Sequence, residues 1–156
     1  MWLVNISVFT YIIFTNVFQF SIRARLIEAT SFVVLHNILD DTGSDVLEMY
    51  GEDCRALGLS PNYPYWGQDV VVDTSNGRVR RLSFYIAAQL LSANGQPLGP
   101  VVLAEAAVIP QIGGHTPRTS GMFFREHLFT ATSPFGNGNL YLSDRKPGVT
   151  RPLPAS

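Results

Sequence analysis

The feature that most constrains the fold is a series of short apolar runs, each ended by glycine, proline or another turn-forming residue. The runs are rich in valine, isoleucine, phenylalanine and tyrosine, and 13 glycines and 10 prolines punctuate the chain. β-Branched and aromatic residues in segments of this length favour strands, whereas glycine and proline favour turns. The sequence therefore predicts an all-β domain with one or two short helices.

Several of these runs are separated by short turn segments, which predicts β-hairpins. Residues 18–24 alternate between apolar and polar side chains, the pattern of a strand that is buried on one face. Asn76-Gly77 between two valine-containing runs is a strong hairpin signal. Strand pairs are expected at residues 17–26 with 32–39, 70–72 with 79–86, 86–91 with 101–109, and 128–132 with 139–143. Short helices are expected at residues 51–59 and 122–128.

Composition and charge argue against several functional classes. A net charge of −1 gives no general attraction for nucleic acid. The single cysteine, Cys54, allows no internal disulfide and is compatible with a reducing, intracellular setting. His36, His115 and His127 are widely spaced and match no metal-binding motif. We therefore expect neither a metal ion nor a cofactor.

The first 22 residues carry no charge, which raises the question of a membrane segment. Polar side chains are scattered through them, and no basic region precedes the apolar part as in a signal peptide. An extra strand or a poorly packed extension is favoured over membrane insertion. We divide the chain into an N-terminal extension of uncertain structure (1–16), a folded domain (17–143) and a loose, proline-containing tail (144–156).

Asp41-Thr42-Gly43-Ser44 follows an apolar run and precedes a second, mixed run beginning at Val46. This placement predicts a tight turn between two strands, where Gly43 lets the chain reverse. The turn presents a carboxylate with two hydroxyls beside it, a grouping suited to the activation of water. The same residue types also occur in ordinary surface turns, so the motif alone leaves both interpretations open.

These residues resemble the signature of retropepsin-like aspartic proteases, the single-lobe branch related to retroelement proteases. The resemblance covers about residues 17–143 and implies a closed or orthogonal β-barrel of the acid-protease type. It implies that Asp41 is catalytic, that Thr42 bonds to its twin, that Gly43 faces the substrate backbone and that Ser44 donates to the carboxylate. One such motif supplies one carboxylate, so a homodimer acting on a peptide or polyprotein is implied, without a cofactor.

Two further segments are compared with this family. The hairpin tip, Asp73, Thr74, Ser75, Asn76 and Gly77, resembles the flap that closes over a bound peptide, although a plain structural hairpin fits the sequence equally well. Thr119-Ser120-Gly121 followed by an apolar segment resembles the second signature of the family.

Three residues depart from the family pattern. The family usually has an apolar residue where this chain has Asp40, and two apolar residues where it has Thr119 and Ser120. Asp40 is expected to face away from the active site and to need a partner if buried. These departures favour an alternative, a non-catalytic retroelement-derived domain that acts in dimerisation or peptide binding. A truncated product with an altered N-terminus is a third interpretation.

Overall fold

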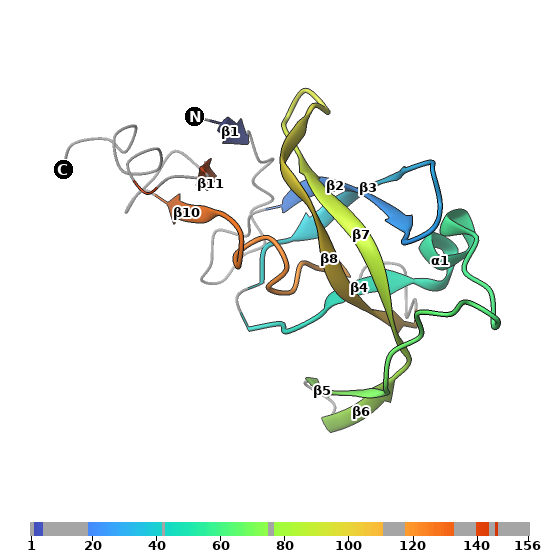
Figure 1. Cartoon of the computed structure of the whole chain (residues 1–156). Coiled ribbons are helices and arrows are strands. Elements are labelled where there is room, and N and C mark those ends of the chain that lie inside the picture. Colours follow the sequence, from blue (N-terminus) through green and yellow to red (C-terminus); the bar gives the residue numbers. More distant parts are fainter. Residues whose placement is uncertain are drawn as a thin grey trace.

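The computed structural model describes residues 2–4, 19–41, 43–74, 77–110, 118–132, 140–143 and 146. In this part of the chain the fold is mostly β-strand with one short helix, as the sequence predicts (Figure 1). The main element is a six-stranded sheet. Its strands in spatial order are β4 (Leu47–Tyr50), β8 (Pro97–Ile109), β7 (Ser83–Leu91), β2 (Gln19–Leu26), β3 (Val33–Leu39) and β9 (Arg118–Thr119).

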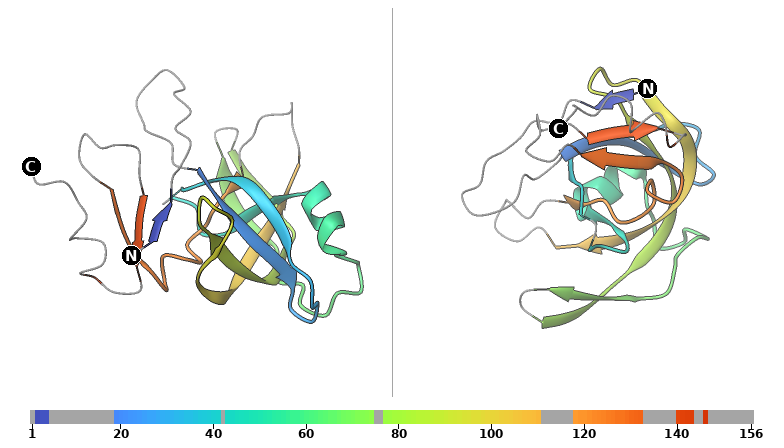
Figure 2. Two further views of the ribbon diagram at one scale, coloured as in Figure 1. Left: turned by 90° about the horizontal axis from the view of Figure 1, so that it is seen from above. Right: turned by 90° about the vertical axis from the view of Figure 1, so that its left-hand side faces the viewer.

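The six-stranded sheet curls until its two edge strands approach each other, so that it is nearly closed into a barrel (Figure 2). β4 runs parallel to β8 and β9 runs parallel to β3, while the other neighbours are antiparallel. Inside lies an apolar core. Its largest fully buried side chains include Phe84, Phe124, Ile22, Ile38, Leu47, Met49 and Ile86.

The hairpin expected near the N-terminus is confirmed as β2 and β3. Phe20, Ile22 and Ala24 of β2 are buried and alternate with half-buried neighbours, because successive side chains of a strand point to opposite faces. β9 was not among the strands expected from the sequence. Its two residues find a partner only because β3 lies beside them.

A β-bulge interrupts the pairing of β3 with β2. Phe20 pairs with Ile38 and Ile22 with Leu35, so two residues of β3, His36 and Asn37, lie opposite one residue of β2. Asn37 has a φ of 59°, in the left-handed region. Because the bulge adds one residue, Leu35 and Ile38 both face the core. The bulge therefore sets the direction in which the strand leaves the sheet.

The helix expected after β4 is confirmed as α1 (Gly51–Leu57). The Asp53 carboxylate accepts a hydrogen bond of 2.8 Å from the backbone N–H of Tyr50, which satisfies a donor at the start of the helix. Gly58, with a φ of 76°, ends the helix in the left-handed conformation that glycine adopts without strain.

The prediction of a helix at residues 122–128 is wrong. The segment forms a series of hydrogen-bonded turns, in which Arg125 N–H donates to Met122 and Leu128 N–H donates to Phe124, both at 2.9 Å. Phe123 and Phe124, adjacent in sequence, are both buried. Gly121, directly before the segment, has a φ of 61° and packs on the backbone of Val46, so tertiary contacts fix how the segment begins.

Two smaller sheets stand apart from the barrel (Figures 1 and 2). β5 (Val70–Thr74) and β6 (Gly77–Arg81) form the expected hairpin, but the strand predicted over 79–86 is interrupted at Leu82. β10 (Phe129–Thr132) and β11 (Leu140–Ser143) pair as expected, and β1 (Trp2–Val4) adds a third strand to them. No helix among the described residues is long and apolar enough to cross a membrane.

Candidate active site

Asp41 lies two residues after the end of β3, in a turn whose backbone binds the Asp41 carboxylate. The backbone N–H of Gly43 donates to Asp41 Oδ1 at 2.9 Å. A Cβ on residue 43 would lie 3.3 Å from the same oxygen, so a side chain there would crowd it. Asp41 Oδ2 receives no hydrogen bond from a described residue, and none of the described cations pairs with the carboxylate. One oxygen is thus held in place while the other can meet water or a ligand.

A second segment, distant in sequence, lies against this turn. The Ser120 N–H donates to the Leu39 carbonyl at 2.9 Å, and the Asp41 N–H donates to Ser120 Oγ at 3.4 Å. Thr119 Oγ1 donates to Ser44 Oγ at 3.0 Å. Ser120 is fully buried. The Asp41 turn and the segment around Ser120 therefore form one unit, held by hydrogen bonds of both backbone and side chains.

Gly121 allows this close approach. Its φ is 61°, and a Cβ built on it would lie 2.5 Å from the Val46 carbonyl carbon and 2.7 Å from the Leu47 nitrogen. Both are backbone atoms, which cannot move aside without displacing the strand that follows the Asp41 turn. A glycine is required here for both conformational and steric reasons.

Asp40 points away from this unit and is paired. The side chain of Asp40 is only 5% exposed, and Arg125 Nη2 lies 2.6 Å from its Oδ1 and 2.5 Å from its Oδ2. Arg125 Nη1 also donates to Thr130 Oγ1 at 3.0 Å. The carboxylate that departs from the family pattern thus has the partner that its burial requires. No local pattern marks Arg125, because it lies 85 positions further along the chain.

A second buried ion pair joins α1 to β9. Arg118 Nε and Nη2 donate to the two oxygens of Asp53 at 2.7 and 2.8 Å, and Nη1 donates to the His36 carbonyl at 3.2 Å. Burial of the guanidinium opposes its charge, but the hydrogen bond and negative charge of Asp53 outweigh this and raise the pKa of Arg118. Nothing in the sequence around Asp53, which lies in the first turn of α1, indicates this partner. The pair holds β9, and hence Ser120, in place.

The other predicted site residues are placed as follows. The Ser44 hydroxyl donates to the Val46 carbonyl at 2.8 Å, so its single proton is directed there in this structure and not at the carboxylate. Asp73 pairs with Arg78 on the exposed face of the hairpin, and Gly77 begins β6. The remaining predictions, Thr42, Ser75, Asn76 and the side chain of Thr74, lie outside the described residues.

The site around Asp41 can support acid–base chemistry by the Asp41 carboxylate. An ionised carboxylate with one oxygen held and one accessible can accept a proton from water, but a single group cannot also protonate a leaving group. Within the described residues, no cluster of three or more His, Cys, Asp or Glu side chains could hold a metal ion. Comparison of the sequence with protein-family models and with curated proteins finds no match to either.

Proposed function

We propose that the chain is one half of a retropepsin-like aspartic endopeptidase, in which Asp41 and the Asp41 of a second copy activate water for peptide hydrolysis. The observation that supports this best is the contact between the Asp41 turn and the Thr119–Gly121 segment. These two segments are the ones that resemble the family's two signatures, and 79 positions separate Asp41 from Ser120. The proposal requires that these two segments lie against one carboxylate, that of Asp41.

The neighbourhood of Asp41 also supports the proposal. The ion pair with Arg125 removes the objection that Asp40 would be a buried, uncompensated charge next to the catalytic group. The β5–β6 hairpin stands out from the barrel below the start of β7 (Figure 1). The proposal assigns to this hairpin the role of the flap that closes over a bound peptide.

A second copy of the chain supplies the second carboxylate. Peptide hydrolysis of this kind requires a base to take a proton from water and an acid to protonate the carbonyl oxygen. Two neighbouring carboxylates that share one proton fulfil both roles, and this is the arrangement on which aspartic proteases in general depend. Two-fold symmetry brings identical residues of two copies together.

The test is cleavage of a mixed peptide library by purified protein. Asp41→Asn is expected to abolish cleavage and leave the unfolding transition unchanged within about 1 kcal/mol, because Asp41 forms no ion pair with a described residue. Asp45→Asn, an exposed neighbour on the same turn, is the matched control and should retain activity. Equal cleavage by Asp41→Asn and the parent would disprove the assignment.

Dimerisation and pH give independent tests of the mechanism. Activity should appear at the concentrations where sedimentation detects a dimer, and the rate should follow a bell-shaped curve in mildly acidic solution, because one carboxyl must be protonated and the other ionised. Activity in a strictly monomeric sample, or its loss on addition of a chelator, would contradict the two-aspartate mechanism.

A non-catalytic dimerisation or peptide-binding domain is the second candidate. It is favoured by the Ser44 hydroxyl, which donates to Val46 and not to Asp41, and by the polar Thr119 and Ser120 where the family has apolar residues. In that case the parent protein dimerises and binds peptides without cleaving them. A peptide inhibitor that mimics the transition state then binds no more tightly than an ordinary peptide of the same sequence.

A further inference from the structure

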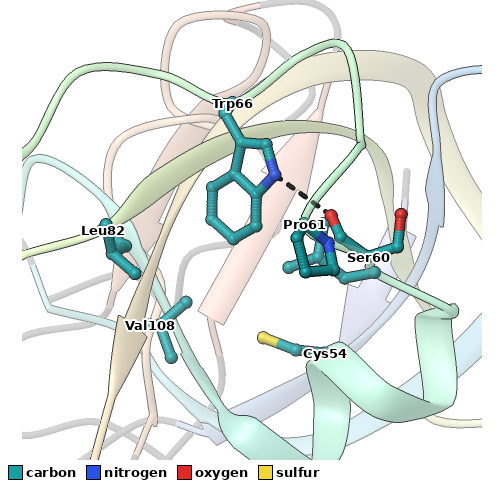
Figure 3. Close-up of a pocket in the computed structure, with 7 residues that line it drawn as sticks. Cys54, Ser60, Pro61, Trp66, Leu82 and Val108 are labelled. Carbon is teal, nitrogen blue, oxygen red and sulfur yellow. Dashed lines mark hydrogen bonds between the residues drawn. The ribbon is translucent and has the colours of Figure 1, made fainter.

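A pocket on another part of the barrel shares no residue with the Asp41 site. Its volume is about 550 Å³, and it lies between α1, the segment that follows α1, Leu82 at the junction of β6 and β7, and the strand β8 (Figure 3). Its lining residues are Cys54, Leu59, Ser60, Pro61, Trp66, Leu82 and Val108. Pockets that bind small molecules have volumes of about 300–1,000 Å³, so the size suits a ligand larger than a single ring.

The walls of the pocket are held in place by hydrogen bonds. Trp66 Nε1–H donates to the Ser60 carbonyl at 3.1 Å, and its ring packs edge-to-face on Phe84. The Val108 N–H donates to the Leu82 carbonyl at 3.0 Å, which joins two further lining residues. A pocket with walls fixed in this way needs little ordering when a ligand binds, and so retains more of the binding free energy.

The segment that carries Trp66 is also held close to β7. The Gly67 N–H donates to the Ser83 carbonyl at 2.9 Å, and a Cβ on residue 67 would overlap Ser83 Oγ. Ser83 is buried, and its hydroxyl donates to the Gln68 carbonyl at 2.6 Å. The approach of the two segments therefore depends on Gly67, and the position of Trp66 follows from it.

The chemistry of the lining residues indicates which class of ligand can bind in the pocket. No charged side chain is among the described residues that line the pocket, and the indole N–H of Trp66 already has a partner in Ser60. A charged ligand would lose hydration without gaining a counter-ion, which is unfavourable. Figure 3 shows the Cys54 sulfur directed toward the space between Trp66, Pro61 and Val108. Burial raises the pKa of this thiol to about 11, with a further contribution from Asp53, so the thiol is neutral at physiological pH.

We propose that this pocket binds a small, uncharged, largely apolar molecule, with an aromatic or aliphatic ring against Trp66. Leu82 lies at the pocket and is 58% exposed. A ligand would cover this apolar surface, and each Å² of apolar area removed from water contributes about 25 cal/mol. The proposal is independent of the proposed catalytic function, because the two sites have no residue in common.

The probe for the test is N-phenyl-1-naphthylamine, an uncharged molecule that fluoresces in apolar surroundings, compared with its anionic relative 8-anilino-1-naphthalenesulfonate. The uncharged probe should bind with a stoichiometry of one per chain and at least tenfold more tightly than the sulfonate. Bound probe should slow the reaction of Cys54, the single thiol, with N-ethylmaleimide in proportion to occupancy. Equal affinity for both probes, or binding without protection of Cys54, would overturn the proposal.

A pair of variants on one strand controls for non-specific adsorption. Val108→Trp places a large side chain in the pocket and should weaken probe binding at least tenfold. Val101→Trp makes the same change at an exposed position of β8 outside the pocket and should leave binding within twofold of the parent. Equal weakening by both variants would overturn the proposal. A probe affinity that falls as the protein concentration rises would also overturn the proposal, since a second copy of the chain would then cover the pocket.

Discussion

Replacement of Arg125 by methionine tests whether the Asp40–Arg125 pair is needed for stability. Arg125→Met leaves the Asp40 carboxylate, 5% exposed, without its cation. Removal of one partner from a buried pair costs about 3–5 kcal/mol, because the remaining charge is neither hydrated nor compensated. We expect a loss in this range in the free energy of unfolding.

The reverse substitution should cost less. In Asp40→Leu the orphaned group is Arg125, whose side chain is 18% exposed and keeps its hydrogen bond to Thr130. A long side chain of this kind can direct its charged end toward water, so we expect a loss of about 1–3 kcal/mol. The double variant removes both charges and places an apolar residue where the family usually has one. The free energy of unfolding of the double variant should lie within about 1 kcal/mol of that of the parent.

The assay is urea unfolding of the four proteins at pH 7, at one fixed protein concentration because dimerisation would add to apparent stability. The cycle should give a coupling free energy of at least about 3 kcal/mol between the two residues, the value that the smallest of these expected losses imply. Arg78→Met is the matched control, because its ion pair with Asp73 has side chains that are 77% and 74% exposed. It should cost less than about 1 kcal/mol. A loss below about 1 kcal/mol for Arg125→Met would refute the reasoning.

Three further predictions concern other parts of the fold. Asn37→Val should lower the free energy of unfolding by about 1–3 kcal/mol and Asn37→Gly by less than about 1 kcal/mol, because only glycine adopts a φ of 59° freely. Equal losses of the two variants in urea unfolding would contradict this prediction. Gly121→Ala should lower the free energy of unfolding by more than about 2 kcal/mol and weaken any cleavage, since the Cβ of the alanine would meet backbone atoms of Val46. Unchanged stability of this variant would refute the prediction. Burial raises the pKa of Cys54 to about 11 from 9.0, so at pH 8 iodoacetamide should modify the native thiol about 100-fold more slowly than the unfolded one; equal rates would contradict the assignment. The stabilisation from this neutral thiol is present below the pKa of the unfolded thiol and is lost as pH rises toward 11.

Local sequence determines most of the strands, the hairpins and the turn that carries Asp41. Alternation at residues 18–24 predicts the buried face of β2, and Asn76-Gly77 predicts the β5–β6 hairpin. These features depend on neighbouring residues, whose periodicity and turn preferences are visible in any short window of the sequence.

Local sequence is insufficient where packing overrides it. Residues 122–128 carry a helix-like pattern, yet the segment forms hydrogen-bonded turns that begin where Gly121 packs on the backbone of Val46. The bulge at Asn37 is likewise a consequence of pairing, because both Leu35 and Ile38 are placed inside the barrel.

The partners of the buried charges are set only by the tertiary structure. Asp40 and Arg125 are 85 positions apart, and Asp53 and Arg118 are 65 apart. Nothing in the pattern around either carboxylate indicates its cation, because the pairing depends on closure of the sheet and not on spacing along the chain. β9 pairs with β3, and closure brings β9 near β4 and Gly121 onto the backbone of Val46, which together place Ser120 against Asp41. The sequence by itself determined that a carboxylate lies on a turn between strands, and the tertiary structure decided which residues surround it.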